Sequence, residues 1–524
     1  MNARLLVLVV SERIAAALLI GLVMGAALGF GGAVWWFRPA FVIGASLLGL
    51  TILIRNLATG EMPLLRSPLG PLGMLALALG IAQLLPMPPK VAEWISPTAH
   101  ELYARGVFPN LAQADDSEAI VPEATQVRSP ATLDRSATLR WLVQAAGCLT
   151  LFWAVSQFVD RLGRLYLVWG LVVGAFFLNA AFGLVQVVNR TEGLYGLFLP
   201  GSGPWWTPGV DDLLNSPATA SLRHLSGISD PEPSGGSRPI ALVPTHPFLF
   251  GTMMGGGGAF LAMGSLSMPL GLAIVAHLVS PRGSRESLFQ RLGQAGQGSL
   301  VILLTGLLAV SGFLTGLFAG PWHAIPLVMG LAVTAFPAGK APGARGPAAG
   351  LAGLLITGLI LGIVTQLHWS ALLGGEPPVS PPEIGLLVET WTECHQVIRE
   401  FPFVGAGLGC FASVHPYFKN SDLTTTTATS SVHQWGVESG VLGLCILIVG
   451  ACWCLWRIPG SLRSLGAEER SLAHGLVGAG VSLSLLAMIH WTLELPAVAV
   501  SASVLGGTWN RWLAGGTDLF VERA

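Results

Sequence analysis

The chain has 524 residues, of which 52% are hydrophobic and only 10% are charged, and its net charge is −1. A soluble domain carries roughly 25% charged residues, so this composition excludes an ordinary soluble protein, and the balanced charge leaves no basic surface for nucleic acid. Backbone groups in lipid must be hydrogen-bonded internally, which leaves helices or a closed barrel. The apolar runs have the length of membrane helices, not of barrel strands, so the sequence predicts helices.

Twelve apolar windows follow one another along the chain and predict about 12 transmembrane helices. The first is interpreted as an uncleaved span, because a second follows at once. The window at 247–280 is long enough for one tilted helix or for a span plus a surface segment. We therefore expect an all-α, polytopic integral membrane protein whose single membrane domain covers residues 1–524. The windows are 14–36, 39–54, 69–88, 138–159, 165–188, 247–280, 299–319, 322–338, 347–369, 434–456, 471–492 and 495–513.

Basic residues orient these spans through the positive-inside rule. With both termini in the cytoplasm, every short inner loop is basic. In a bacterium, this assignment predicts a multi-pass protein of the inner (cytoplasmic) membrane, with its outer face in the periplasm. The residues placed inside are Arg55, Arg66, Arg161, Arg164, Arg282, Arg285, Arg291, Lys340, Arg345, Arg457, Arg463, Arg470, Arg511 and Arg523.

Three long loops then face the periplasm, at 89–137, 189–246 and 370–433. Long loops gathered on one face commonly carry function. They contain no P-loop, zinc-protease or dinucleotide motif. The glycine-rich run at Gly405 to Gly409 follows no strand, which argues against a nucleotide site. The sequence thus predicts neither a cofactor nor a metal. Cys394 and Cys410 share the third loop, either as a disulfide or as free thiols.

Several polar side chains in the second and third loops are candidates for chemistry. An arginine on the outer face is unexpected and fits anion binding, since a guanidinium grips phosphate through two parallel hydrogen bonds; the alternative is solvated or carboxylate-paired loop charge. His433 follows a helix cap and is either a general base or an interfacial histidine. Glu438 lies in an apolar run, where it orients a site or bridges helices. The other candidates are Arg190, Arg223, His224, Arg238, Glu393, His395, Arg399, Glu400, His415, Lys419 and Asp422.

Three segments of the chain resemble the O-antigen ligase/polymerase family. They are 391–411 (WTECHQVIREFPFVGAGLGCF), 415–417 (HPY) and 434–443 (QWGVESGVLG). The first is similar to the family's outer loop, and the last to the helix that follows that loop. Residues 84–88, 96–97, 183–186 and 194–196 are similar to its upstream signatures, so the resemblance spans roughly residues 80 to 445.

The resemblance implies a metal-independent membrane glycosyltransferase of the GT-C type, active in polysaccharide or lipopolysaccharide biosynthesis. Such an enzyme moves a glycan from a polyprenyl-pyrophosphate carrier to a glycan or lipid acceptor at the periplasmic face. By this analogy Arg238 and Arg223 bind the pyrophosphate, with Arg399 as a further candidate. His433 is the base and Glu438 its companion. Two histidines, His246 and His395, are possible accessory residues.

The chain departs from the family pattern in three places. Thr429 occupies the position of the family's base, and His433 follows four residues later. Four residues are one helical turn, so this spacing predicts that the His433 ring reaches the same helical face. A family Asn-His pair reads Thr245-His246, and an expected arginine is missing from 310–316 (VSGFLTG). The alternatives are a non-catalytic member that binds or helps to export a lipid-linked glycan, and a transporter. The choice between ligase and polymerase stays open, as do the sugar, the acceptor and the oligomeric state.

Overall fold

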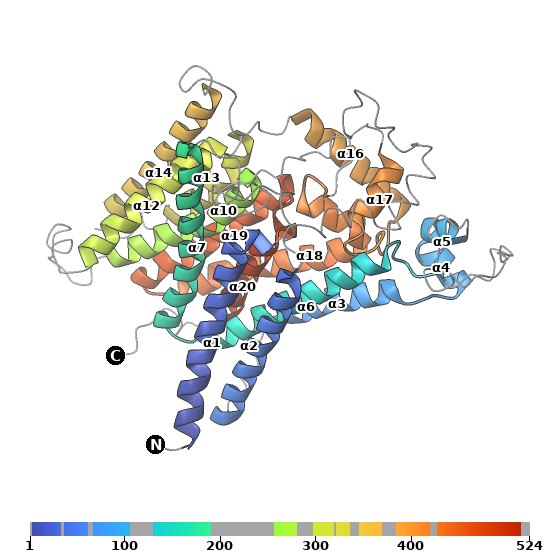
Figure 1. Ribbon diagram of the computed structural model, residues 1–524, viewed down its shortest axis with the longest axis horizontal. Helices are drawn as coiled ribbons and strands as arrows, with labels where there is room; N and C mark the ends of the chain where they lie inside the picture. Colours follow the sequence, from blue (N-terminus) through green and yellow to red (C-terminus); the bar gives the residue numbers. More distant parts are fainter. Residues whose placement is uncertain are drawn as a thin grey trace.

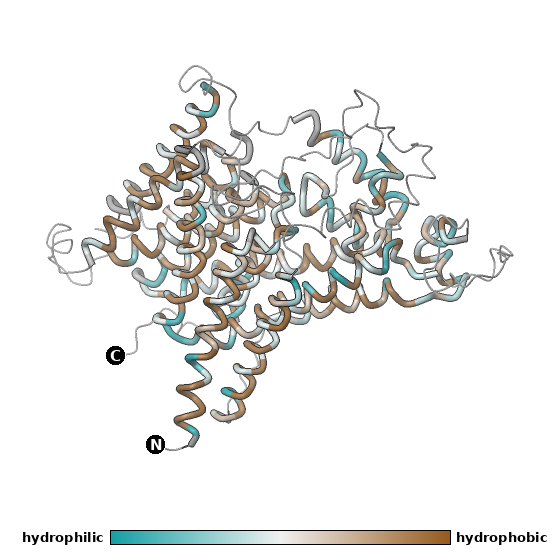
Figure 2. The backbone as a smooth tube through the Cα atoms, in the orientation of Figure 1, coloured by the Kyte–Doolittle hydropathy of each residue, from teal (hydrophilic) through white to brown (hydrophobic). Residues whose placement is uncertain are grey.

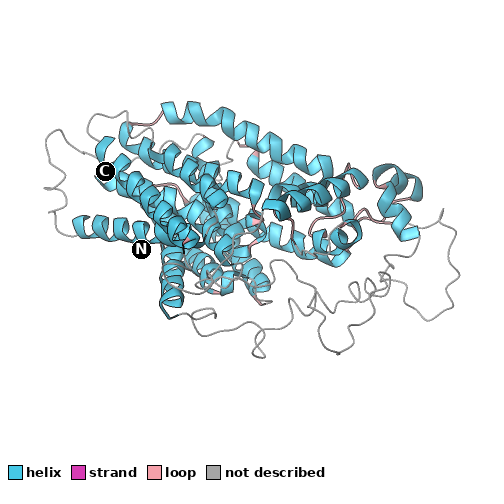
Figure 3. Ribbon diagram, turned by 90° about the horizontal axis from the view of Figure 1, so that it is seen from above, coloured by secondary structure: helices cyan, strands magenta, loops and turns pink. Residues whose placement is uncertain are grey.

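A computed structural model describes residues 3–32, 36–60, 67–104, 129–189, 256–279, 297–318, 321–335, 345–368, 384–419 and 427–514. Within these ranges the chain is helical and has no strand, only one isolated bridge between Met87 and Ser129. Figure 3 shows the helices from above. The expected all-α class is therefore confirmed for the described part of the protein.

A helix occupies each of the twelve predicted windows. Of the helices in the described ranges, nine are long and apolar enough to cross a membrane, which makes this a membrane-embedded, polytopic protein. The long window at 247–280 holds one helix, α10, and residues 247–255 lie outside the described part. The twelve are α1 (Ala3–Leu28), α2 (Phe37–Thr59), α3 (Leu69–Leu84), α6 (Arg135–Phe158), α7 (Leu162–Asn189), α10 (Gly256–Val279), α12 (Gln297–Phe318), α13 (Pro321–Ala335), α14 (Arg345–Leu367), α18 (Ser431–Arg463), α19 (Ala467–Ile489) and α20 (Pro496–Leu513).

Four shorter helices fall inside the first and third predicted loops. They are α4 (Pro89–Ile95), α5 (Pro97–Ala104), α16 (Ile384–Glu400) and α17 (Phe411–Phe418). They lie toward one end of the molecule (Figure 1), and more hydrophilic residues mark this end in Figure 2. Helices α5, α16 and α17 share a small apolar core, to which Tyr103, Val397, Phe401 and Phe411 contribute, together with Ala137 of α6 and Val437 of α18. The first and third loops are thus partly folded into one helical layer.

The main bundle packs around α10, which is almost wholly buried, with α19, α13, α12 and α7 against it. Two glycine pairs let α12 and α14 approach backbone to backbone. A Cβ on Gly316 would lie 2.0 Å from the carbonyl oxygen of Leu359, and one on Gly362 would lie 2.1 Å from that of Phe313. Each glycine has a partner four residues earlier, Gly312 or Gly358, which is the small-residue pattern of membrane helix packing.

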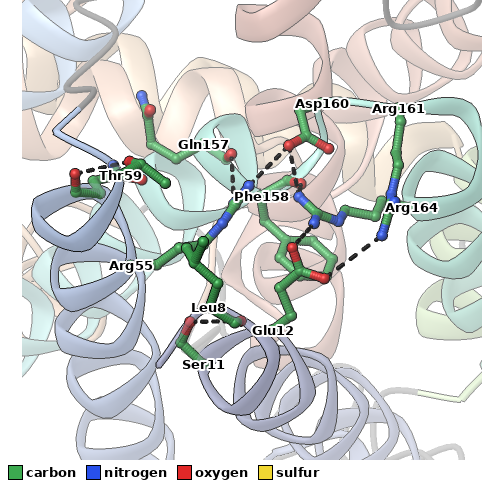
Figure 4. Close-up of polar contacts among 11 residues, drawn as sticks. Leu8, Ser11, Glu12, Arg55, Thr59, Gln157, Phe158, Asp160, Arg161 and Arg164 are labelled. Carbon is green, nitrogen blue, oxygen red and sulfur yellow. Dashed lines mark hydrogen bonds and ion pairs between the residues drawn. The ribbon is translucent and has the colours of Figure 1, made fainter. Parts of the chain in front are cut away.

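An ionic cluster joins α1 and α2 to the turn between α6 and α7 (Figure 4). Asp160 accepts hydrogen bonds from Arg55 at 2.8 Å and from Arg164 at 2.7 Å. Arg164 also pairs with Glu12, and Arg161 lies 3.6 Å from the same carboxylate. The cluster thus gathers Arg55, Arg161 and Arg164 at one end of the bundle, and the sequence assigned all three to the same side of the membrane.

Replacing Asp160 should destabilise the bundle, because the Arg55 and Arg164 side chains are only 12% and 8% exposed. We expect Asp160→Asn to lower the free energy of unfolding by about 3 kcal/mol, since it leaves two buried guanidinium groups without their shared carboxylate. Thermal unfolding in detergent measures the change. Glu389→Gln, at an exposed position on α16, is the matched control. Equal midpoints for the two variants would contradict the structural role of the cluster.

Candidate functional site

The glycine loop, residues 401–410, is inserted into a break in α18. At Gly440 the helix has φ 61° and ψ −160°, so two hydrogen bonds of the regular i to i−4 ladder are not made. The loop supplies a partner for each of the four freed backbone groups. In these bonds Ala406 N–H donates to Val437 O (2.9 Å), Gly407 N–H to Glu438 O (3.1 Å), Val441 N–H to Pro402 O (2.8 Å) and Leu442 N–H to Phe403 O (3.2 Å).

Glu438 fastens the loop from the side of the helix. Its carboxylate is buried and accepts hydrogen bonds from the backbone N–H groups of Gly409 (2.8 Å) and Phe411 (3.2 Å). Gln434, one turn earlier, donates to the same carboxylate at 3.1 Å. Both carboxylate oxygens are therefore engaged. Glu438, predicted as a catalytic companion, has the contacts of a residue that positions the loop and the start of α17.

Gln83 of α3 fastens the loop from the opposite side, and no motif in the sequence singles it out. Its amide nitrogen donates to the carbonyl oxygens of Val404 (2.6 Å) and Glu438 (2.9 Å). Its amide oxygen accepts from the Leu408 N–H at 3.0 Å. Gln83 is 1% exposed and lies inside a predicted apolar window. A buried amide is costly without partners. A glutamine inside an apolar window was therefore the only feature of the sequence that hinted at a structural role for Gln83.

The glycines of the motif are required by backbone geometry. Gly405, Gly407, Gly409 and Gly440 all have positive φ, a conformation that other residues adopt only with strain. A Cβ on Gly440 would also lie 2.6 Å from both Gly405 N and Phe403 O. The spacing of these glycines is thus explained by the close approach of the loop to the broken helix.

Gly440→Ala should therefore expel the loop and cost about 3 kcal/mol or more of stability. Gly460→Ala in the same helix is the matched control, because a Cβ there meets no atom within 4 Å. The control should be neutral or more stable by about 0.5–1 kcal/mol. Thermal unfolding in detergent measures both variants, and a stable, wild-type-like Gly440→Ala protein would argue against the insertion.

A polar and aromatic face of α16 meets the start of α18. Trp391, His395 and Arg399 recur every four residues and so share one side of α16. His433 stacks on Trp391 with ring centroids 5.0 Å apart and lies edge-on to His395 at 5.2 Å. His395 and Arg399 are exposed, whereas His433 is half-buried. Among the predicted site residues in the described ranges, the structure thus brings His395 and His433 together, with Arg399 on the same helix face.

The two histidines have different hydrogen-bonding states. His395 Nδ1 lies 2.8 Å from the carbonyl oxygen of Trp391; a carbonyl only accepts, so Nδ1 carries the proton and Nε2 of the neutral ring keeps its lone pair. His433 Nδ1 is buried and has no hydrogen-bond partner in the described part of the chain. A buried N–H without a partner is rarer than a buried acceptor without one, so the proton of neutral His433 belongs on Nε2. Each neutral ring therefore keeps one lone pair, but His433 Nδ1 is buried, whereas the side chain of His395 is exposed.

Thr429 does not share a helical face with His433, contrary to the spacing argument from the sequence. The helix begins at Ser431, and Ser430 is its cap with extended backbone angles of φ −138° and ψ 129°. The Ser430 hydroxyl accepts from the His433 N–H at 3.3 Å. Thr429 therefore precedes the helix, and its hydroxyl oxygen is buried without a hydrogen-bond partner. The prediction failed because it extended the 3.6-residue period past the cap.

The turn between α19 and α20 wraps around the same helix start. The His490 carbonyl oxygen accepts from the Ser431 N–H at 3.2 Å, and the Leu493 N–H donates to the Ser431 hydroxyl at 3.1 Å. Glu494 follows in this turn and is half-buried. Burial raises the pKa of its carboxyl to about 8, and the negative charge of Glu438 adds to the shift.

This raised pKa makes stability depend on pH with a definite sign. The carboxyl of the unfolded chain ionises above its ordinary pKa of 4.5, while the folded one keeps its proton up to about pH 8. As far as this carboxyl is concerned, the folded state is therefore most stable below pH 4.5 and loses stability as the pH rises to about 8, because the unfolded chain ionises more readily than the folded one. We expect Glu494→Gln to flatten the fall of the unfolding midpoint between about pH 5 and pH 8. Glu389→Gln is the control, and parallel profiles for all three proteins would contradict the assignment.

The two loop cysteines are free thiols, so the disulfide alternative is wrong. Both are fully buried, and burial raises the pKa of each to about 12. Cys410 Sγ instead lies 3.1 Å from the Thr132 hydroxyl.

Near Cys394, the buried Glu393 carboxylate lies 2.8 Å from His415 Nε2. Burial lowers the pKa of His415, and the bond to Glu393 opposes that shift. Glu393 and His415 are therefore buried interior groups and are not part of the exposed face of α16.

Six of the predicted polar candidates lie outside the described ranges, namely Arg190, Arg223, His224, Arg238, His246 and Asp422. In the third departure from the family pattern, residues 310–316, a Cβ on Gly312 would lie 3.1 Å from the Leu355 carbonyl oxygen, so α12 packs closely on α14 there. In the described part of the chain, no group of three or more histidine, cysteine, aspartate or glutamate residues is placed to hold a metal ion.

The sequence matches no protein-family model, and no curated protein matches it. Any functional conclusion therefore depends on the motifs of the chain and on the geometry of the face shared by α16 and α18.

Proposed function

We propose that the protein is a membrane glycosyltransferase of the O-antigen ligase/polymerase type. It would transfer a glycan from a polyprenyl-pyrophosphate carrier to a glycan or lipid acceptor at the periplasmic face of the bacterial inner membrane. The proposal includes twelve spans, cytoplasmic termini and the three periplasmic loops.

The observation that carries the proposal is the cluster of unsatisfied polar atoms around the start of α18. Trp391 Nε1, Thr429 Oγ1 and His433 Nδ1 are all buried and have no hydrogen-bond partner among the described residues. Buried polar groups are otherwise nearly always paired, so such a cluster favours a polar ligand. It adjoins an exposed imidazole, His395, on the helix face that also carries the exposed guanidinium of Arg399. These are the groups that transfer from a diphosphate carrier needs.

The chemistry requires one proton acceptor and stabilisation of the leaving group. An acceptor hydroxyl attacks the anomeric carbon of the donor glycan and gives its proton to a base. The bond between the anomeric carbon and the phosphate oxygen breaks, and the polyprenyl pyrophosphate leaves with the electron pair. Guanidinium groups stabilise the charge on its oxygens. We assign the base to His395 Nε2, supported by His433, and the leaving group to Arg399 together with Arg223 and Arg238.

An apolar groove suited to the carrier's chain lies on α7 and α12, apart from α16 in Figure 1. It has a volume of about 450 Å³ and lies between α7 and α12, where Leu184, Ile302 and Leu303 line it. These three side chains are exposed. An isoprenoid chain is apolar along its whole length, so burial in such a groove is favourable.

Single substitutions test the transfer chemistry. In cells that depend on this protein for a surface polysaccharide, His395→Ala should lower polymer formation about 10²-fold or more, as expected for loss of a general base. Arg399→Ala should also lower it, and His433→Ala should have a smaller effect than His395→Ala. The polysaccharide is measured on gels and the polyprenyl-linked donor by mass spectrometry, where the donor should accumulate.

The controls are His368→Ala and Arg463→Ala, which change exposed residues elsewhere in the chain. Both should leave polymer and donor at wild-type levels. If His395→Ala, His433→Ala and Arg399→Ala all retain full transfer, the protein is not the transferase, and a role in binding or export of the glycan is favoured instead.

A further inference from the structure

The exposed surface of α18 changes character at the break. Before Gly440 the helix presents mostly buried positions, including the polar Gln434 and Glu438. After it, large apolar side chains are exposed at Val441, Leu442, Leu447, Ile448, Val449 and Leu455. Such a surface suits lipid and not water. The part of α18 that faces lipid therefore begins directly after the inserted loop.

A stacked aromatic pair lies at the same level along α18 as the start of this lipid-facing surface. Trp94 of α4 stacks on Phe403 of the glycine loop, with ring centroids 6.2 Å apart and planes inclined by 17°. The Phe403 carbonyl oxygen accepts from the Leu442 N–H, which fixes the level of the pair along α18. Trp94 is 76% exposed and Phe403 is 52% exposed. A large exposed aromatic pair beside an apolar helix surface is typical of a membrane interface.

The other end of the same surface carries a second aromatic side chain. Trp456 is 76% exposed, and Arg457 follows it. From Leu442 to Trp456 the helix advances about 21 Å at 1.5 Å per residue. The aromatic rings extend this span at both ends toward the roughly 30 Å of a hydrocarbon core. The neighbouring α3 has 16 residues, about 24 Å, and agrees with that thickness.

Helix α4 has the composition of a surface anchor. Lys90 precedes Trp94 by four residues and Val91 precedes it by three, so all three share one face. All three are exposed, and Lys90 forms no ion pair within the described ranges. A lysine can extend its ammonium group to lipid phosphate while an adjacent indole sits at headgroup depth.

We propose that Lys90, Val91, Trp94 and Phe403 form an interfacial surface that rests in the phospholipid headgroup layer of one leaflet, while Trp456 and Arg457 mark the opposite leaflet. His433 lies nine residues before Leu442, on the far side of the break at Gly440. The imidazoles and the Glu438 carboxylate then lie outside the hydrocarbon core, in or beyond the headgroup layer. The proposal concerns depth alone and does not depend on the transfer chemistry.

Nitroxide labels measure this depth in the full chain. Cys148, Cys445, Cys452 and Cys454 are replaced by alanine, while the fully buried Cys394 and Cys410 stay. Single labels are placed at Val91→Cys and Phe403→Cys, with Glu389→Cys as the aqueous reference and Val449→Cys as the lipid reference. The protein is reconstituted in vesicles of phosphatidylcholine and phosphatidylglycerol. Collision rates with dissolved oxygen and with a polar nickel complex give the depth of each label.

Labels at Val91 and Phe403 should show ratios of oxygen to nickel collisions between those of the two references. Ratios equal to the aqueous reference at both positions would overturn the proposal, and a further change on adding soluble polysaccharide would identify the pair as a glycan-binding surface instead. Ratios equal to the lipid reference would also overturn it, because the surface would then lie within the core. Val91 is outside the stacked pair, so its label decides the depth even if Phe403→Cys disturbs the loop.

Discussion

The exchange of hydrogen bonds at Gly440 is the interaction on which the rest of the outer structure depends. A membrane helix normally satisfies its backbone within itself, and an interruption leaves polar groups that lipid cannot bind. Here the freed carbonyls of Val437 and Glu438 and the freed amides of Val441 and Leu442 all pair with one loop. The break and the loop therefore stabilise each other, and neither is stable in this form alone.

The position of the candidate site follows from this exchange. The glycine loop joins α16 to α17 and is bonded to α18, which fixes the end of α16 against the start of α18. That contact brings His395 to His433 and leaves Arg399 exposed on the same helix. Glu438 and Gln83 are occupied with the loop, so the groups left for chemistry are His395 and Arg399 on α16 and His433 at the start of α18. The site is thus built from a surface helix supported by a membrane helix.

The sequence was informative where one physical rule dominated. Apolar length predicted a helix in each of the twelve windows, and the glycine spacing marked a loop whose positive φ angles now explain it. Contacts between distant segments were not predictable. Gln83 shows no pattern in its own window, because its partners lie 321 and 355 residues later. Thr429 was wrongly placed on the helix, because α18 begins only after the capping residue Ser430. Arg223 and Arg238 stay as predictions.

The long separation of Gln83 from its partners has a consequence for biogenesis. Chains are synthesised at about 5–20 residues per second, so α3 waits roughly 15 to 60 seconds between its own emergence from the ribosome and that of Val404, 321 residues later. During that interval the side-chain amide of Gln83 has neither of its native acceptors, Val404 O and Glu438 O. Insertion of α3 must therefore rely on the translocation machinery, on interfacial water or on a temporary neighbour until the C-terminal third of the protein is made.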